Sequence, residues 1–256
     1  MLPMFKQANK KVIFFDFNDT LVDKQRSFYN AYAQALEEFT ARSDTLDWQA
    51  ATAVERYAKE WSAKPSKIKA RTRASQKLSA SGHYELRQLE CMRRSLQGSP
   101  FPVTKPFVRS LLKRTKELIP YHPQLFPDVA DTLRKLADSY QLAIISNGPM
   151  EKLALTLEHS GLKPLFRDEH IFAAQHHKLK KPHPTIFQTA LTKLNIQPAS
   201  AVMVGNSWRN DVQGASRSEI DAVWLQHHSK KTGVRRIGKT KVILATRSKQ
   251  LLQLFE

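Results

Sequence analysis

Short apolar runs alternate with helix-like segments over the two ends of the chain. The runs occupy residues 11–16, 142–145, 201–204, 222–225 and 242–245. Runs of this length are typical of buried strands in a parallel sheet. Between them, apolar residues recur every three or four positions over 133–137, 153–157 and 187–194, a spacing that predicts helices with one apolar face. The alternation predicts an α/β fold with a doubly wound parallel sheet, whose active site lies at the carboxyl ends of the strands.

A different pattern separates the first of these runs from the others. Aromatic and apolar residues there recur mostly at helical spacing: Phe28, Tyr32, Leu36, Phe39, Trp48, Tyr57 and Trp61. No strand-like run of similar quality occurs in this stretch. We therefore expect residues 1–23 and 122–256 to form the sheet domain, and residues 24–121 to form an inserted α-helical domain.

The composition is that of a globular protein, because 41% of the 256 residues are hydrophobic and 25% are charged. The single cysteine, Cys91, can neither close an intrachain disulfide nor build a multi-thiolate metal site, so a reducing cytoplasm is the expected location. No apolar run approaches the roughly 20 residues that cross a bilayer. The N-terminal stretch reaches Asp16 and Asp19 before any sequence typical of signal-peptide cleavage. We expect neither a signal peptide nor a membrane span.

The formal net charge of +18 is concentrated in two segments. Residues 64–117 contain fourteen basic and three acidic residues, and residues 227–249 contain eight basic residues and no acidic one. Basic regions attract anions, which suits a phosphorylated or carboxylated substrate and also suits nucleic acid. A solvated charged surface explains the pattern equally well, and no nucleic-acid-binding motif accompanies it.

Carboxylates follow two of the predicted strands. Asp16 ends the first run and is followed by a turn-like sequence over 17–23. A carboxylate at a strand end can act as a nucleophile or a metal ligand, although this segment alone could be an ordinary surface turn. The sequence 205–211 leaves another strand and can bring Asp211 back over the sheet edge. Hard cations prefer such carboxylate oxygens.

Two further polar sequences precede predicted helices. Ser146, Asn147 and Gly148 place a hydroxyl and backbone N–H groups just ahead of a helix, where a phosphate is favoured. An ordinary helix N-cap explains these residues as well. Lys181, held by prolines at the next helix entrance, could neutralise a phosphoryl oxygen or an acidic nucleophile, and a solvated basic turn is equally consistent with the composition.

Together, and in this order, the sequences 16–23, 146–149, 181–184 and 205–211 resemble the four motifs of the haloacid dehalogenase superfamily of hydrolases. The resemblance covers the predicted sheet domain, and the insert lies where that family places a helical cap. It implies a Rossmann-like core with the active site beneath the cap. Four ordered motifs at four strand ends are far more specific than any one of them.

The resemblance also implies roles for individual residues. Asp16 would be the nucleophile that attacks phosphorus and forms an aspartyl-phosphate, and Lys181 would stabilise it and the developing charge. Phosphoryl oxygens would be held by Thr20, Ser146, Asn147 and Gly148. A Mg²⁺ ion would be held by Asp16, Asn18, Asn206 and Asp211. Because a phosphate monoester is anionic, attack by a carboxylate requires a cation and oriented donors that offset the repulsion.

Two positions depart from the pattern of the phosphatases in this family. Asn18 stands where they carry the aspartate that protonates the leaving group and later activates water, and an amide can do neither. Its backbone carbonyl can still bind the metal, so binding is expected to survive. Turnover is expected to fall by about 10²–10⁴, unless a substrate with a good leaving group or a residue of the cap compensates. Asn206 stands where many relatives place an acidic metal ligand, so the metal site should be weaker.

Three interpretations remain open. The leading one is a Mg²⁺-dependent, aspartyl-phosphate-forming phosphatase that acts, slowly or selectively, on a small phosphate ester. The second is a metal-independent, haloacid-dehalogenase-like hydrolase, which fits a non-acidic residue at both altered positions, although that branch usually carries a tyrosine where Asn18 stands. The third, less favoured, is a catalytically weakened module that binds phosphate or nucleic acid through the basic segments.

Overall fold

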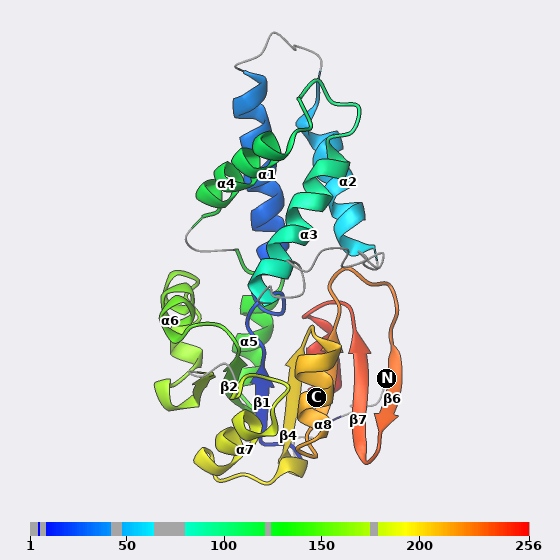
Figure 1. The fold of residues 1–256 in the computed structure, drawn as a ribbon. Helices are drawn as coiled ribbons and strands as arrows, with labels where there is room; N and C mark the ends of the chain where they lie inside the picture. The colour runs from blue at the N-terminus through cyan, green and yellow to red at the C-terminus, as the bar shows by residue number, and fades with distance from the viewer. Residues whose placement is uncertain are drawn as a thin grey trace. The chain divides into compact units, whose positions relative to one another are not determined.

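The computed structural model describes residues 5, 9–41, 48–63, 80–120, 124–174 and 179–255, without the side chains of residues 80 and 81. The chain divides into two compact units, each visible in Figure 1. The first unit contains Met1–Lys24 and His122–Glu256, and the second contains Gln25–Tyr121. The first boundary lies one residue after the expected one, and the second coincides with it.

The first unit contains a seven-stranded sheet in the order β3-β2-β1-β4-β5-β7-β6. Its strands are β1 (Val12–Phe15), β2 (Gln141–Ser146), β3 (Ile171–Ala173), β4 (Ala201–Gly205), β5 (Asp221–Leu225), β6 (Gly233–Ile237) and β7 (Thr240–Ala245). All neighbouring strands are parallel except β6 and β7. The arrangement confirms the α/β, Rossmann-like fold class, with one antiparallel strand that the sequence analysis did not anticipate. The exception arises because only two residues connect β6 to β7, which is too short for the crossover that a parallel pair needs.

The centre of the sheet is β1, which pairs with both β2 and β4. Phe15 lies opposite Ile144 on one side and Val204 on the other. All four residues of β1 are buried, as expected for a strand covered on both faces. The carboxyl ends of β1, β2 and β4 therefore lie side by side, so the residues that follow these strands share one edge of the sheet.

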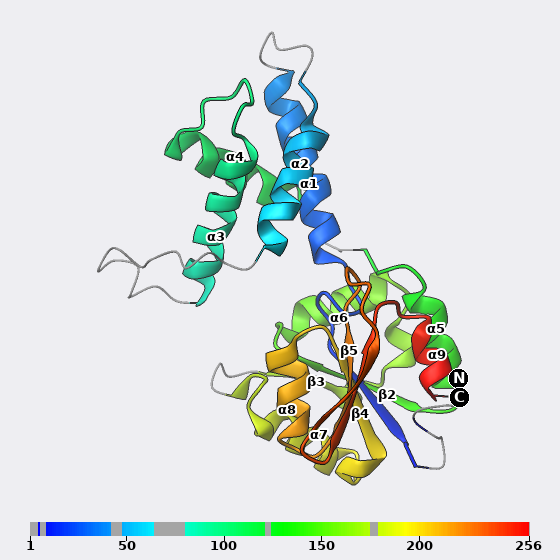
Figure 2. The ribbon, with the colours of Figure 1, turned by 90° about the vertical axis from the view of Figure 1, so that its right-hand side faces the viewer.

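Helices cover both faces of the sheet (Figure 2). They are α5 (Val129–Ala137), α6 (Met150–His159), α7 (Pro184–Lys193), α8 (Gln213–Ser216) and α9 (Gln250–Phe255). Apolar side chains of α5, α6 and α9 pack with Ile13 and Phe15 on one face. Those of α7 and α8 pack with Val12 and Phe14 on the other. The alternate residues of β1 thus face two separate apolar layers, as strand geometry requires.

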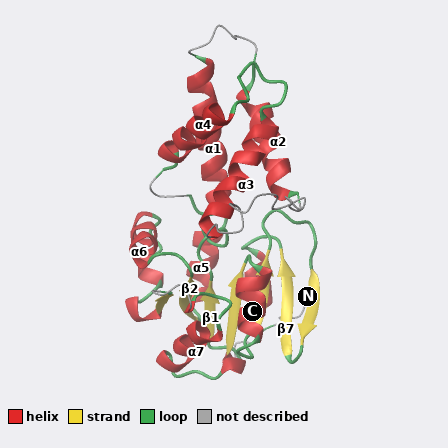
Figure 3. Ribbon diagram, in the orientation of Figure 1, coloured by secondary structure: helices red, strands yellow, loops and turns green. Residues whose placement is uncertain are grey.

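The described part of the second unit consists of helices without a strand, as Figure 3 shows. They are α1 (Lys24–Thr40), which begins at the last residue of the first unit's N-terminal segment, α2 (Ala50–Ser62), α3 (Ala80–Ser95) and α4 (Lys105–Leu118). Their core is aromatic: the ring centroids of Phe28 and Tyr57 lie 5.1 Å apart, and the hydroxyl of Tyr32 lies 2.9 Å from Ser95 Oγ. The predicted basic residues between 64 and 77 lie outside the described residues. Among the helices that are described, none combines the length and the apolar character needed to cross a membrane.

Candidate active site

Asp16 follows β1 directly, at the carboxyl edge of the sheet. Its backbone N–H donates to Val204 O at 2.8 Å, which continues the β1–β4 ladder to this residue. The chain then turns at once, because the N–H groups of Leu21 and Val22 both donate to Phe17 O at 3.0 and 3.1 Å. This turn holds the Asp16 carboxyl at the strand end, where only 8% of the residue is exposed.

Lys181 joins two carboxylates that are 195 residues apart in the chain. Its Nζ donates to Asp16 Oδ1 at 2.6 Å and to Asp211 Oδ1 at 2.7 Å. The side chains of Lys181 and Asp211 are 1% and 2% exposed, so water screens these ion pairs little. The structure therefore brings the residues of the first, third and fourth sequence motifs into one buried cluster.

The charged groups in this cluster shift one another's pKa values. Burial raises the pKa of Asp211 to about 6, although the Lys181 ammonium opposes that shift. Burial alone would lower the pKa of Lys181, but the charges of Asp16 and Asp211 outweigh it, and its pKa lies above the ordinary value. Lys181 is thus held as a cation beside two carboxylates, one of which ionises less readily than a free aspartate.

Thr20 connects the first loop to Asn206. Its hydroxyl lies 3.1 Å from Asp16 Oδ2 and 3.4 Å from Asn206 Oδ1, and it accepts a hydrogen bond from the Asn206 N–H at 3.0 Å. Thr20 is fully buried. The hydroxyl consequently holds one carboxylate oxygen of Asp16, while Lys181 holds the other.

A tight turn after β4 places Asp211. The segment Trp208–Val212 forms a π-helical turn, a geometry that is frequent at functional sites. The Ser207 N–H donates to Asp211 Oδ2 at 2.8 Å, which directs the carboxyl back toward the strand end. Only glycine fits at position 205, because a Cβ there would lie 2.4 Å from Asp211 Oδ2.

The second sequence motif lies beside the cluster, at the end of β2. Ser146 is buried, and its Oγ accepts the Gly148 N–H at 3.0 Å. A Cβ on Gly148 would lie 3.2 Å from Asn18 Nδ2, so the Asn18 amide packs directly against this turn. The geometry brings Asn18, Ser146 and Gly148 together.

The family resemblance implies that Asn147 contacts a phosphoryl oxygen, but its side chain contacts the backbone of Lys181. Its Nδ2 donates to Lys181 O at 3.0 Å, and its Oδ1 accepts the Lys181 N–H at 2.7 Å. Both polar groups of the side chain are therefore engaged by the backbone of Lys181. This contact favours a positioning role, in which Asn147 fixes the segment that carries the ammonium.

Asp19 adjoins the site and is unusual in two respects. Its backbone is left-handed, with φ at 58°, a conformation that aspartate tolerates better than most residues. Its Oδ1 is buried without a hydrogen-bond partner among the described residues. Burial raises the pKa of Asp19 to about 6. A second, poorly ionised carboxyl thus stands next to Asn18.

Three residues at the carboxyl end of β5 and just after it support the site and were missed by the sequence analysis. Trp224 Nε1 and Gln226 Nε2 donate to Asn206 O at 2.9 and 2.7 Å. His227 Nε2 lies 2.9 Å from Thr20 O. Because a carbonyl oxygen only accepts, Nε2 carries the proton and donates this hydrogen bond. The signal that could have identified them is their position at the end of a strand next to β4.

The predicted Mg²⁺ ligands are Asp16, Asn18, Asn206 and Asp211, and all four lie at this edge of the sheet. Among the described residues, no group of three or more His, Cys, Asp or Glu side chains is arranged to hold a metal. A site here would therefore combine two carboxylates with amide or backbone oxygens. Each carboxylate has about four acceptor positions, so the hydrogen bonds above leave capacity for a cation. An oxygen-only donor set fits Mg²⁺, with less negative charge than a site with a third carboxylate.

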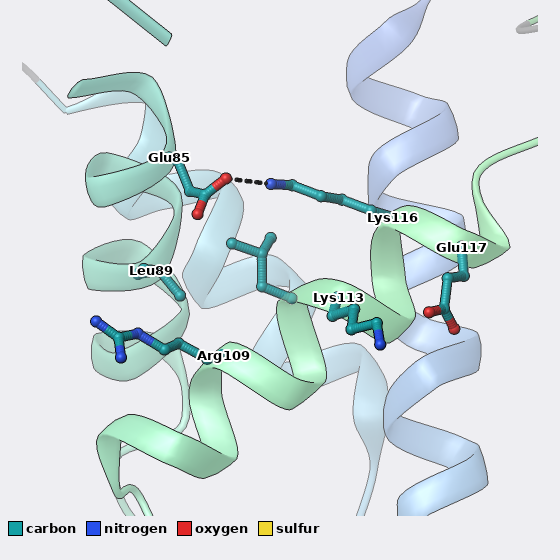
Figure 4. A pocket seen from close by; sticks show the side chains of 7 residues that line it. Glu85, Leu89, Arg109, Lys113, Lys116 and Glu117 are labelled. Carbon is teal, nitrogen blue, oxygen red and sulfur yellow. Dashed lines mark hydrogen bonds and ion pairs between the residues drawn. The ribbon is translucent and has the colours of Figure 1, made fainter. Parts of the chain in front are cut away.

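The second unit has a hollow of its own, about 550 Å³ in volume, between α3 and α4 (Figure 4). Its lining residues are Glu85, Leu89, Arg109, Leu112, Lys113, Lys116 and Glu117. The Lys116 Nζ donates to Glu85 Oε2 at 2.7 Å across the space between the two helices. The volume is in the range of small-ligand pockets, and the hollow contains no residue of the Asp16 cluster.

Comparison with known proteins identifies the family. The glyceraldehyde 3-phosphate phosphatase of Pyrococcus furiosus is 28% identical over 234 residues, which cover 85% of this chain and 81% of that enzyme. The (S)-2-haloacid dehalogenase 4A of Burkholderia cepacia is 35% identical over 115 residues, 44% of this chain and 46% of that protein. The crystal structure of the HAD-hydrolase YfnB from Bacillus subtilis, bound to magnesium, shares the fold with a TM-score of 0.63 at 18% identity, over 96% of this chain and 98% of YfnB.

A family model described as haloacid dehalogenase-like hydrolase matches residues 10–218. The match begins just before β1 and extends through α8, so it includes all four sequence motifs and the helical insert. The chain belongs to the haloacid dehalogenase-like family and is a hydrolase.

Proposed function

We propose that this hydrolase is a phosphatase that cleaves small phosphate esters through an aspartyl-phosphate on Asp16. The observation that carries the proposal is the buried cluster in which Lys181 Nζ contacts both Asp16 and Asp211. An anionic substrate needs positive charge at the point of attack, and a cation fixed in a dry site supplies it without reorganisation. Similarity to a phosphatase over 81% of that enzyme's length supports the same substrate class.

The first step forms one bond and breaks one. An Asp16 carboxylate oxygen attacks phosphorus, the bond between phosphorus and the ester oxygen breaks, and the departing alkoxide takes a proton from water. In the second step, water attacks the phosphorus of the acyl phosphate and releases inorganic phosphate with a free Asp16. Thr20 orients the carboxylate through its hydrogen bond to Oδ2, and Lys181 offsets the charge that develops on the phosphoryl oxygens.

The remaining polar groups supply positions for the phosphoryl group and the cation. The Ser146 hydroxyl lies beside Asn18, where it can donate to a phosphoryl oxygen while its Oγ accepts the Gly148 N–H. Mg²⁺ would be held by Asp16, Asp211, Asn206 and the backbone carbonyl of Asn18. When bound, the ion offsets negative charge on the phosphoryl group.

Asn18 limits the rate in this proposal. An amide cannot protonate the leaving oxygen, and loss of a general acid costs about 10²–10⁴ in rate. Substrates with good leaving groups need that proton least. We therefore expect aryl phosphates and acyl phosphates to be hydrolysed faster than alkyl phosphates.

A substrate screen tests the proposal. The chain would be assayed for phosphate release from p-nitrophenyl phosphate and a panel of phosphorylated metabolites, with Mg²⁺ and with EDTA. Release that requires Mg²⁺ and is lost in Asp16→Asn supports the proposal. Release that persists in Asp16→Asn, or absence of release from every ester, contradicts it.

A second candidate is a dehalogenase, which displaces halide from carbon with the same carboxylate. Asn18 and Asn206 favour it, since both replace acids that metal-dependent phosphate chemistry uses, and a 2-haloacid dehalogenase is 35% identical over part of the chain. Chloride release from 2-chloropropionate without added metal would support this activity. The presence of Lys181 between two carboxylates fits both reactions, so the two assays are run side by side.

A further inference from the structure

The C-terminal part of the first unit carries a charge that the proposed reaction does not use. No acidic residue occurs between Asp221 and Glu256. Five cations within ten residues are exposed to solvent: Lys230, Lys231, Arg235, Arg236 and Lys239. None of their side chains has a hydrogen bond or an ion pair with any residue that the structure describes. The basic hairpin is defined as residues 230–241, and these five of its cations are therefore not neutralised by the described part of the protein around them.

The basic hairpin forms the outer edge of the sheet. β6 pairs with β7 alone and is the last strand in the sheet order, as Figure 1 shows. Gly238, with φ at 57°, occupies the first central position of the two-residue turn, where glycine is preferred. Successive strand residues point to opposite faces, so Arg235 and Arg236 project on the two sides of the sheet. The edge thus presents cations on both of its faces.

One pair of like charges in the hairpin has a carboxylate beside it, because Asp221 Oδ1 accepts the Lys241 N–H at 2.7 Å. Arg236 lies directly opposite Lys241 in the antiparallel register. Like charges at directly opposed positions destabilise a strand pair. Cations on an edge strand also discourage pairing with another chain, but that role does not explain the two lysines in the preceding loop. An anionic partner would neutralise the five exposed cations of the basic hairpin.

We propose that the basic hairpin binds the phosphate backbone of a nucleic-acid duplex. A sheet viewed along its edge, with side chains on both faces, is about 10 Å thick, and the major groove of B-DNA is about 12 Å wide. Cations on the two faces of β6 can then reach the two backbones that flank the groove. The exposed charged residues are all cations and form no base-reading pattern, so binding is independent of the nucleotide sequence. The surface contains no residue of the Asp16 cluster.

Salt dependence measures this interaction directly. The full chain would be titrated into a fluorescein-labelled duplex in fluorescence anisotropy, over a series of KCl concentrations. Five phosphate contacts predict a slope of log K against log salt of about −4.5. The variant Arg235→Thr/Arg236→Thr/Lys239→Gln should flatten the slope by about 2.7, which weakens binding by about a hundredfold or more at 0.1 M salt. Arg235→Lys/Arg236→Lys keeps the charge and should keep the slope.

Two further variants separate this surface from the general charge of the protein. Lys11→Ala/Lys135→Ala/Lys193→Ala removes three exposed cations elsewhere in the first unit and should change the affinity less than about threefold. Lys230 and Lys231 lie outside the strand ladder. The variant Lys230→Gln/Lys231→Gln therefore tests the surface even if Arg235→Thr/Arg236→Thr/Lys239→Gln does not fold. The proposal is overturned if no duplex binds at low salt, if both triple variants lose affinity equally, or if a single strand of the same length binds as tightly as the duplex.

Discussion

Replacement of Lys181 by methionine tests the centre of the site, because methionine keeps much of the side-chain length and removes the charge. The Lys181 side chain is 1% exposed, and its Nζ lies 2.6 Å from Asp16 Oδ1 and 2.7 Å from Asp211 Oδ1. Lys181→Met leaves both carboxylates facing each other without a cation. Loss of one partner from a buried ion pair costs about 3–5 kcal/mol of unfolding free energy.

A double variant shows whether that cost arises at this contact. Asp211→Asn removes one of the two carboxylates that Lys181→Met leaves without a cation. The combined variant Lys181→Met/Asp211→Asn should therefore recover at least about half of the lost 3–5 kcal/mol, since only Asp16 remains uncompensated. Its turnover should not recover, because the positive charge at the point of attack is still missing.

Lys10 provides a matched control. It is a buried lysine that precedes β1, at the opposite end of the strand from Asp16, and its Nζ donates to Asp221 at 2.8 Å and to Ala199 O at 2.6 Å. Lys10→Met should lower stability while leaving turnover of the folded protein within a few-fold of the wild type.

The assays are urea unfolding followed by fluorescence, and the initial rate of p-nitrophenyl phosphate hydrolysis with Mg²⁺. We expect Lys181→Met to lower kcat by about 10²–10³, as for loss of one preorganised electrostatic group. An unchanged kcat in Lys181→Met, or an equal loss in Lys10→Met, would refute the assignment of Lys181 to the reacting group.

Three other substitutions probe neighbouring parts of the site. Asn18→Asp should raise turnover by about 10²–10⁴ by restoring a general acid, whereas Asp19→Asn should change it less than tenfold; a flat or lower rate in Asn18→Asp means that the amide has its own role. Gly205→Ala places a Cβ 2.4 Å from Asp211 Oδ2. It should lower the free energy of unfolding in urea by about 1–3 kcal/mol and raise the Mg²⁺ concentration needed for half-maximal rate. A wild-type Mg²⁺ titration would count against Asp211 as a metal ligand. His227→Phe retains an aromatic ring and removes the donor to the first loop; stability should fall by about 1–3 kcal/mol with a lower kcat, and unchanged values for both would show that this hydrogen bond is dispensable.

The sheet was predictable where burial dominates the sequence. β1, β2, β4, β5 and β7 are continuous apolar runs because both faces are covered, and such runs are easily recognised. β3 has only three residues, too few for a pattern to emerge. β6 contains two adjacent arginines and is almost wholly exposed, so hydrophobicity gave no sign of it. Its pairing depends on the short turn to β7, which lies outside the apolar pattern.

The site was predictable as far as strand ends determine it. Asp16 follows β1, Ser146 ends β2 and Asp211 lies in the turn after β4, and parallel strands bring their carboxyl ends to one edge. The contact between Asn147 and the Lys181 backbone joins two motifs 34 residues apart, and sequence spacing does not encode it. Likewise, support from His227 depends on strand order, in which β5 lies beside β4.

The account depends on Asp16 attacking phosphorus, and trapping the phosphorylated enzyme tests this most directly. The protein would be mixed with a ³²P-labelled aryl phosphate and Mg²⁺, quenched in acid, digested and analysed by mass spectrometry, with Asp16→Asn as the control. We predict a hydroxylamine-labile phosphate on Asp16 and none in the variant. Turnover without label on Asp16, or label on another residue, would contradict the account.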